Sequence, residues 1–399
     1  MVYIEAKAPG KVLWLGGYSV LEPGNIGFVT TINAYVTASL KPIKSREVKI
    51  DAPDLGVSLS GNLDNDNHVK TTAPKELVLA LTATNIALGY LTALGQNVKG
   101  FEITTKNDSA FEYRVGNNTG DKRVTKSGMG SSSAVTVAIT SAILKAFGGE
   151  LYSIDAVHKL SQLSHSLATG KVGSGFDIAA ATYGSIKYSR YNPDLLKNFP
   201  QDYSPADIKN LIEYKWDYKA EKLNLPDMFS TSMANFVGDA AITTEMVGSV
   251  SGFKKENPES YNQIIKAMNL HAENSLQALE NINKGIEVDY NTRKFKDEFI
   301  MNRKYSKQLG VKSKVNIEDD EATKLIDESE SNGAFVAKLP GAGGRDSIVA
   351  LSLNDSSAKN LKGFWASKNN LQLLELSMQN GGVSVADSKN KTTRFRAKI

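Results

Sequence analysis

A glycine and serine segment, Gly128-Met-Gly-Ser-Ser-Ser133, runs directly into the apolar stretch 134–147. Apolar side chains in that stretch recur at helical spacing, and Gly148 follows as a stop signal. Glycines let backbone amides approach a ligand, and the amino end of a helix carries partial positive charge and unpaired N–H groups. The segment therefore predicts a phosphate-binding turn at the start of a helix. A serine cap without any ligand is the simpler alternative.

Strands and helices are mixed in both halves of the 399-residue chain, which indicates an α+β fold. Strands are expected at 2–8 and 12–17, around a tight turn at Ala8–Lys11, and at 28–40. Helices are expected at 75–94, 134–147, 153–167, 232–250, 258–284, 289–309 and 318–331. Because the chain exceeds the length of one typical domain, we expect two domains, 1–195 and 196–399.

The composition argues against several classes of protein. Lys and Arg number 47 against 43 Asp and Glu, and the resulting charge of +4 is too mild to indicate a nucleic acid or an anionic membrane as partner. The chain has no cysteine, which excludes disulfides, thiolate zinc sites and cysteine nucleophiles. No apolar run suggests a signal peptide or a membrane span. We therefore expect a cytoplasmic protein that binds neither nucleic acid nor membrane.

Three further glycine segments carry charged side chains. They are Pro9-Gly10-Lys11, Lys171-Val-Gly-Ser-Gly-Phe-Asp177 and Pro340-Gly-Ala-Gly-Gly-Arg-Asp346. Four such segments are more than turn formation requires, and cations beside them suit an anionic ligand. These cations are Lys11, Lys126, Lys171 and Arg345. For each segment taken singly, an ordinary turn with a solvated surface cation remains the alternative.

Signatures of other nucleotide-binding and hydrolytic proteins are absent. The chain has no GxxxxGK[ST], no complete GxGxxG and neither HRD nor DFG, which argues against P-loop proteins and protein kinases. Its four histidines form no HExxH, and no GxSxG is present. Zinc hydrolysis and serine hydrolysis therefore lack their usual local geometry.

Three motifs, taken in order along the chain, resemble those of the GHMP kinase superfamily, which includes galactokinases and the homoserine, mevalonate and phosphomevalonate kinases. The motifs are Ala8-Pro-Gly-Lys11 with Gly16-Gly-Tyr-Ser-Val-Leu-Glu-Pro23, Lys126-Ser-Gly-Met-Gly-Ser-Ser-Ser133, and Leu339-Pro-Gly-Ala-Gly-Gly-Arg345. Met129 and Ser133 depart mildly from the usual GLGSSA. Within the superfamily, GGYSVLEPG and GKVGSGFDIAAATYGSI are most similar to the phosphomevalonate kinase family.

The resemblance implies an N-terminal domain like ribosomal protein S5 domain 2, a ferredoxin-like C-terminal domain, and ATP between them. Lys11 and Asp177 match the catalytic pair, and Ser132 matches the serine that reaches Mg²⁺. Mevalonate kinases carry a metal-binding glutamate shortly before the aspartate, where this chain has His165 and Ser166. Mg²⁺ would then be held by Ser132, ATP and water, with Asp177 as a further candidate. The residues that match the ATP-binding segment are Lys126, Gly128, Met129, Gly130, Ser131, Ser132 and Ser133, and those of the third glycine motif are Gly341, Gly343 and Gly344.

An acceptor such as 5-phosphomevalonate carries a phosphate and a carboxylate, so its pocket should be cationic and rich in hydroxyl groups. The candidates for contact with it are Tyr18, Ser19, Lys171, Ser174 and Arg345. Another GHMP enzyme, either a mevalonate kinase or a mevalonate-phosphate decarboxylase, remains an alternative. So does a sensor that binds ATP or a metabolite without turnover. The sequence leaves open whether the chain is a monomer or a homodimer.

Overall fold

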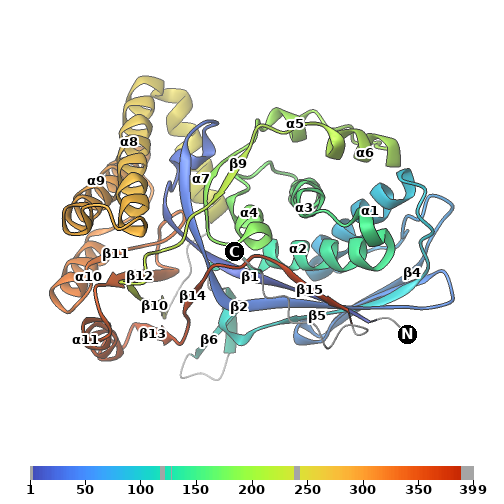
Figure 1. Cartoon of the computed structure of the whole chain (residues 1–399), viewed down its shortest axis with the longest axis horizontal. Coiled ribbons are helices and arrows are strands. Elements are labelled where there is room, and N and C mark those ends of the chain that lie inside the picture. Colours follow the sequence, from blue (N-terminus) through green and yellow to red (C-terminus); the bar gives the residue numbers. More distant parts are fainter. Residues whose placement is uncertain (1–2, 117–121, 127, 238–242, 388–399) are drawn as a thin grey trace.

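The structure is a computed structural model that describes residues 3–116, 122–126, 128–237 and 243–387; the side chains of 112–126 and 243–244 lie outside the description. Figure 1 shows two lobes side by side, an N-terminal one built on a long sheet and a C-terminal one that holds a smaller sheet and a tall helical hairpin. The expected α+β architecture is confirmed.

A long antiparallel pair of strands, β1 (Ile4–Leu15) and β2 (Ile26–Pro42), organises the N-terminal sheet. Along its main path the sheet runs β15-β1-β2-β5-β3-β4; β8 and β14 also pair with β2, and β9 pairs with β8. The bounds of these other strands are β3 (Glu47–Ala52), β4 (Val57–Asn62), β5 (Phe101–Asn107), β8 (Ile186–Ser189), β9 (Lys219–Lys222), β14 (Met378–Gln379) and β15 (Ser384–Asp387). A separate hairpin joins β6 (Glu112–Gly116) to β7 (Lys122–Lys126).

The predicted turn at Ala8–Lys11 was wrong, because β1 continues through it. Its pairing with β2 shifts register between Pro9 and Lys11. Proline has no N–H to give to a regular ladder, and a bulge at such a place bends the strand and re-aims the next side chain. The irregularity thus sets the direction in which Lys11 leaves the sheet.

Helices cover one face of the N-terminal sheet (Figure 1). They are α1 (Val78–Ala93), α2 (Ser131–Ile143), α3 (Ile154–Thr169), α4 (Phe176–Tyr183), α5 (Asp194–Lys197) and α6 (Pro205–Glu213). The segments Lys75–Ala93 and Ser131–Leu151 are long and apolar enough to pass for membrane spans, contrary to the expectation from the sequence, yet 61% of each apolar window is buried inside the protein. Apolar residues on all sides of a helix are typical of such a core position.

The C-terminal sheet has the order β11-β12-β10-β13, with every neighbouring pair antiparallel. Its strands are β10 (Ser230–Phe236), β11 (Val336–Lys338), β12 (Ser347–Ser352) and β13 (Leu371–Leu374). In chain order the strands are linked by α10 (Asp320–Ser331) after β10 and by α11 (Asp355–Ala366) after β12, which is the ferredoxin-like βαββαβ arrangement. Three helices, α7 (Thr243–Glu256), α8 (Pro258–Asn283) and α9 (Val288–Ser313), are inserted between β10 and α10.

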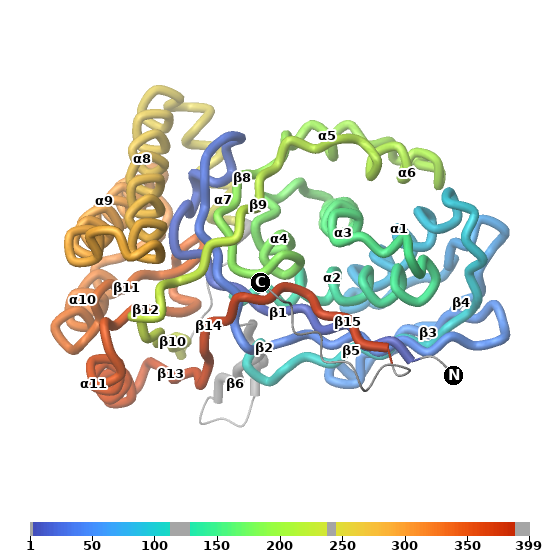
Figure 2. Tube along the Cα trace, in the orientation of Figure 1, coloured from blue at the N-terminus to red at the C-terminus, as the bar shows by residue number. Residues whose placement is uncertain are grey.

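Two expectations about the second half need correction. The helix expected at 232–250 is replaced in its first part by β10, whose residues pair with both β12 and β13, so sheet pairing overrides the local pattern. The domain boundary expected at 195/196 does not match the sheets either. Strand β9 pairs with β8, and β14 and β15 return to β2 and β1. Figure 2 shows this C-terminal segment, in red, running back beside the N-terminal strands.

Candidate active site

A cavity of about 570 Å³ is lined by residues of both halves of the chain. One part of its wall comes from the end of β1, the turn after β1 and the segment Gly128-Met-Gly130, called the Gly128 turn below. The rest comes from the loop before α4, from α7 and from the segment after β11. The lining side chains that bear on chemistry are Lys11, Tyr18, His165, Thr169, Lys171, Ser174, Phe176, Asp177, Asp346 and Ser347. Every glycine segment singled out in the sequence therefore contributes to one cavity.

Lys11 is held by the Gly128 turn through both its backbone and its side chain. Its backbone N–H donates to the carbonyl of Met129 at 2.9 Å, and its Nζ donates to the carbonyl of Gly128 at 2.9 Å. The ammonium lies 5.4 Å from the centre of the Phe176 ring. Burial lowers the pKa of Lys11, and the carboxylates of Asp177 and Asp346 oppose this shift. The ammonium is thus positioned by the same turn that was predicted to bind phosphates.

Asp177 lies in the first turn of α4. Its Oδ2 accepts a hydrogen bond from the Ser133 hydroxyl at 2.5 Å, and its Oδ1 accepts from the N–H of Ile178 at 3.0 Å. Burial raises the pKa of Asp177, but His165, Ser133, Lys11 and Ile178 together outweigh it, so the pKa is lowered. The carboxylate therefore stays ionised beside the ammonium of Lys11.

The Gly128 turn depends on two glycines with positive φ, Gly128 at 69° and Gly130 at 85°. A Cβ at Gly130 would lie 3.1 Å from Cε of Lys11, so a side chain there would press on the lysine. Helix α2 begins at Ser131, and its cap residue Gly130 has no side chain that could accept a hydrogen bond from the first N–H groups. The amino end of a helix with such a cap suits an anion.

The side chains of the segment expected to bind ATP are not all placed alike. Met129 and Ser133 are buried, and the Ser133 hydroxyl bonds Asp177. Ser131 and Ser132 are half-buried in the first turn of α2. Lys126 ends β7, but its side chain lies outside the described residues. The Ser133 hydroxyl thus contacts the aspartate, and a contact of Ser133 with phosphate stays a prediction.

The third glycine motif reaches the cavity through Gly341 and Gly343. Tyr18 donates its hydroxyl to the carbonyl of Ala342 at 3.0 Å, which links the turn after β1 to this motif. The N–H of Gly344 donates a hydrogen bond to the carbonyl of Ile317 at 3.0 Å. The motif therefore joins the two halves of the chain at the cavity wall.

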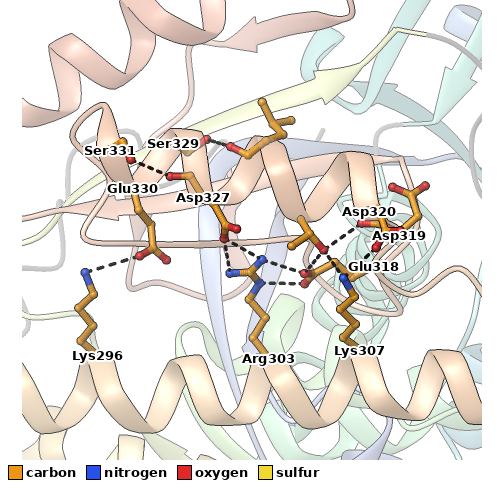
Figure 3. A network of polar contacts seen from close by, with 12 residues as sticks. Lys296, Arg303, Lys307, Glu318, Asp319, Asp320, Asp327, Ser329, Glu330 and Ser331 are labelled. Atoms are coloured by element: carbon orange, nitrogen blue, oxygen red, sulfur yellow. Dashed lines mark hydrogen bonds and ion pairs between the residues drawn. The ribbon is translucent and has the colours of Figure 1, made fainter.

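Charged side chains of α9 pair with α10 and with the segment that leads into it (Figure 3). Arg303 binds both carboxylate oxygens of Glu318, at 2.9 and 2.8 Å. Asp319 accepts from the N–H of Ala322 at 2.8 Å, which caps α10. Because Ile317 and Asp319 flank Glu318, this network fixes the segment against which the glycines pack.

Of the five predicted acceptor contacts, the fold brings Tyr18, Lys171 and Ser174 to the cavity. Ser19 is fully buried, and its hydroxyl donates to the carbonyl of Gly16 at 2.6 Å. Arg345 is not among the described lining residues. Its guanidinium pairs with Asp319 at 2.8 Å and with Glu321 at 2.5 Å. The expected roles of Ser19 and Arg345 in acceptor binding therefore have no support in where their side chains lie.

Sequence reasoning missed two titratable residues of the site, His165 and Asp346. His165 lies on α3, and its charge lowers the pKa of Asp177. Asp346 approaches the Gly128 turn so closely that a Cβ at Gly128 would lie 3.5 Å from its Oδ2. Asp346 directly follows the third motif, and that position was the available signal. For His165 the available signal was its position where mevalonate kinases carry a metal-binding glutamate, since its spacing alone did not distinguish it from a core histidine.

Comparison with known proteins agrees with this architecture. Residues 81–185 match the GHMP kinases N terminal domain, and residues 299–371 match the GHMP kinases C terminal domain. The phosphomevalonate kinase of Saccharolobus solfataricus is 32% identical, over 87% of this chain and 90% of that protein. The phosphomevalonate kinase of Candida albicans is 30% identical, over 87% and 89% respectively. The chain belongs to the GHMP kinase family.

The fold is also that of a solved relative. The structure of Streptococcus pneumoniae phosphomevalonate kinase in complex with phosphomevalonate and AMPPNP superposes with a TM-score of 0.72 at 21% identity. The match covers 94% of this chain and 99% of that one. At this identity the likeness concerns the fold, and it includes both halves of the molecule.

Proposed function

We propose that the chain is a phosphomevalonate kinase. It transfers the γ-phosphoryl group of ATP to (R)-5-phosphomevalonate and yields 5-diphosphomevalonate and ADP, a step of the mevalonate pathway. The observation that carries the proposal is the meeting of Lys11 and Asp177 at one cavity beside the Gly128 turn. Curated phosphomevalonate kinases related to this chain over most of its length support the choice of acceptor.

The acceptor determines what the site must do. The second pKa of a phosphate monoester is near ~6, so the attacking oxygen is already largely ionised at neutral pH. A hydroxyl acceptor would benefit much more from a general base. Repulsion between two phosphate groups is then the larger obstacle, and a cation between them lowers it. Lys11 supplies that cation, and Asp177 acts chiefly by orienting Lys11 and the acceptor.

ATP would lie with its phosphates over the Gly128 turn and the amino end of α2. The described residues hold no group of three His, Asp or Glu side chains that could bind a metal ion. Mg²⁺ usually needs only one or two carboxylates together with substrate phosphates and water. Asp177 and Asp346, both at the cavity, fit that requirement, with Ser132 as the hydroxyl candidate. When bound, Mg²⁺ would neutralise negative charge on the nucleotide.

The decisive experiment offers mevalonate, 5-phosphomevalonate and 5-diphosphomevalonate separately with ATP, and monitors both ADP and CO₂. We expect ADP release with 5-phosphomevalonate and no CO₂. Turnover of mevalonate instead would make the protein a mevalonate kinase, and CO₂ release would make it a decarboxylase. Binding of ATP without turnover of any of the three would leave a sensor. A cytoplasmic location and the absence of nucleic acid and membrane partners stay predictions.

A further inference from the structure

Three successive carbonyls, immediately before the helix turn that carries Asp177, accept hydrogen bonds from side chains. The donors come from α3, from β8 and from the residue after β8. The pairs are Gly173 with Arg190 at 2.7 Å, Ser174 with Tyr188 at 3.1 Å, and Gly175 with Gln162 at 2.8 Å. All three donor side chains are at least nine-tenths buried, with exposed fractions of 5%, 0% and 3% for Arg190, Tyr188 and Gln162.

This arrangement leaves the loop little freedom. The carbonyl of Gly175 also accepts the first backbone hydrogen bond of α4, from the N–H of Ala179 at 3.0 Å. Gly173 and Ser174 lie before the helix, and buried side chains that packing holds in place bind their carbonyls. The backbone at Gly175 has φ of 80°, and a Cβ there would lie 2.7 Å from the amide nitrogen of Gln162. Asp177 follows two residues later. A shift of the loop would therefore move the carboxylate directly.

Arg190 has a second contact on the opposite side. Its other terminal nitrogen donates to the carbonyl of Leu21 at 2.6 Å. Leu21 and Gly173 both line the cavity, so one guanidinium joins two of its walls. The first wall is the turn that carries Tyr18, and the second leads into Asp177. A planar guanidinium holds two acceptors at fixed relative positions, which an ammonium on a flexible stem does not.

Gln162 is itself oriented by a buried neighbour. Its amide nitrogen lies 3.0 Å from Nε2 of His158. Burial lowers the pKa of His158 to about 3, so the imidazole is neutral at physiological pH and its Nε2 can accept from the amide. The amide nitrogen therefore faces both His158 and the carbonyl of Gly175, and the orientation that binds the loop is favoured.

We infer that Arg190 is a positioning residue for phosphoryl transfer. Together with Tyr188 and Gln162 it holds the 173–175 loop, and with it Asp177, against the wall that carries Tyr18. The inference rests on the proposed function for the identity of the acceptor. The three hydrogen bonds to the loop would position Asp177 in the same way for any acceptor.

The test compares Arg190→Lys and Tyr188→Phe with the wild type. Lysine keeps the charge but lacks the planar fork that fixes both carbonyls, and phenylalanine removes only one hydroxyl. For Arg190→Lys we expect kcat to fall on the order of 10²-fold, the size that a small misplacement of reacting groups can cause. The KM for the acceptor should rise, whereas the KM for ATP should change by less than about twofold. Tyr188→Phe should lower kcat by roughly a few-fold.

The matched control is Arg46→Lys. Arg46 also donates to two backbone carbonyls, those of Leu63 and Asp64, but lies among exposed residues away from the cavity. Its kinetic constants should equal those of the wild type. If Arg190→Lys and Tyr188→Phe fold and keep the wild-type kcat and KM values, the inference is overturned. A lower melting temperature with unchanged kinetics would overturn it equally, because the bonds would then serve stability alone.

Amide hydrogen exchange separates this inference from the proposed function. In Arg190→Lys the amides of 174–178 should exchange faster than in the wild type, while those of β8 keep their protection. If the wild type fails to use 5-phosphomevalonate, the proposed function falls, yet faster exchange in this loop still supports its restraint by Arg190. Unchanged exchange in the loop would overturn that restraint whatever the acceptor.

Discussion

Ser133 and Asp177, 44 positions apart in the chain, are joined by a hydrogen bond of 2.5 Å. The bond connects the first turn of α2 with the first turn of α4. The helix start expected to bind phosphate and the carboxylate beside Lys11 are therefore held as one unit.

Replacing Ser133 by alanine removes this donor from Asp177. Because the pKa of Asp177 is lowered in the folded protein, its contribution to stability is present above its unfolded pKa and is lost as pH falls through the folded value. Without Ser133 that folded pKa should rise. The acid limb of the stability profile, the free energy of unfolding against pH, should then move to higher pH, and that free energy should fall by about 1–3 kcal/mol at neutral pH.

The control for this experiment is Ser164→Ala. Ser164 is equally buried, but it donates only within α3, to the carbonyl of Leu160 at 2.7 Å. Its loss should leave the acid limb where it is. Identical pH profiles for the wild type and Ser133→Ala would contradict the coupling between Ser133 and Asp177.

Lys11→Met and Asp177→Asn should differ in severity. The acceptor phosphate is already ionised, so the methionine variant loses charge neutralisation, and the asparagine variant loses mainly orientation. We expect the larger loss of kcat for Lys11→Met. The rate of Asp177→Asn should not recover steeply at high pH. Steady-state rates across pH measure both effects, and a steep recovery would show that Asp177 acts as a general base.

Gly130→Ala should damage the site more than backbone strain alone explains. Its φ is 85°, and the new methyl group would lie 3.1 Å from Cε of Lys11. Gly56 is also left-handed, with φ of 67°, but a methyl group there would meet no described atom within 4 Å beyond its chain neighbours. Both variants should lose on the order of 1 kcal/mol of stability, since alanine disfavours this backbone region. A marked fall in kcat is expected for Gly130→Ala alone, and equal rates for the two would argue against the contact with Lys11.

Lys338 makes the free energy of unfolding depend on pH in the alkaline range. Its Nζ donates to the carbonyl of Trp14 at 2.9 Å across the two halves, and burial lowers its pKa from 10.5 to about 8, against the opposing influence of Glu318. Between pH 8 and 10.5 the unfolded chain holds a proton that the folded chain has lost, so folding is favoured as pH rises. The unfolding free energy of the wild type should gain about 3 kcal/mol relative to that of Lys338→Met over this range. Urea unfolding of both proteins across the same pH range measures the difference, and parallel curves would refute it.

Arg345→Ala should act on stability rather than on acceptor binding. Its side chain is 42% exposed and pairs with Asp319 and Glu321. Exposed pairs contribute about 1 kcal/mol or less and are screened by salt. We expect a small, salt-sensitive fall in melting temperature, with no selective change in the KM for the acceptor. A selective rise in that KM would instead restore the direct contact expected from the sequence.

Much of the fold could be predicted because long periodic segments indicate their own secondary structure. The helices expected at 258–284 and 289–309 are present as α8 and α9 within a few residues. The strand β10 was predicted as helix, because its pairing with β12 and β13 depends on residues more than a hundred positions away. The return of β14 and β15 to the first sheet has no local signal at all.

The order of residues was enough to locate the reactive groups along the chain. Glycines that permit positive φ, a helix start and the residues Lys11 and Asp177 are local properties, which residue type and spacing carry. Which side chains serve the cavity depends instead on the three-dimensional arrangement. That arrangement directs the Ser133 hydroxyl toward Asp177 and the Arg345 guanidinium toward Asp319. It also brings His165 to the cavity wall. The reason is that the direction of a side chain is set by packing and by partners distant in sequence, which no local pattern encodes.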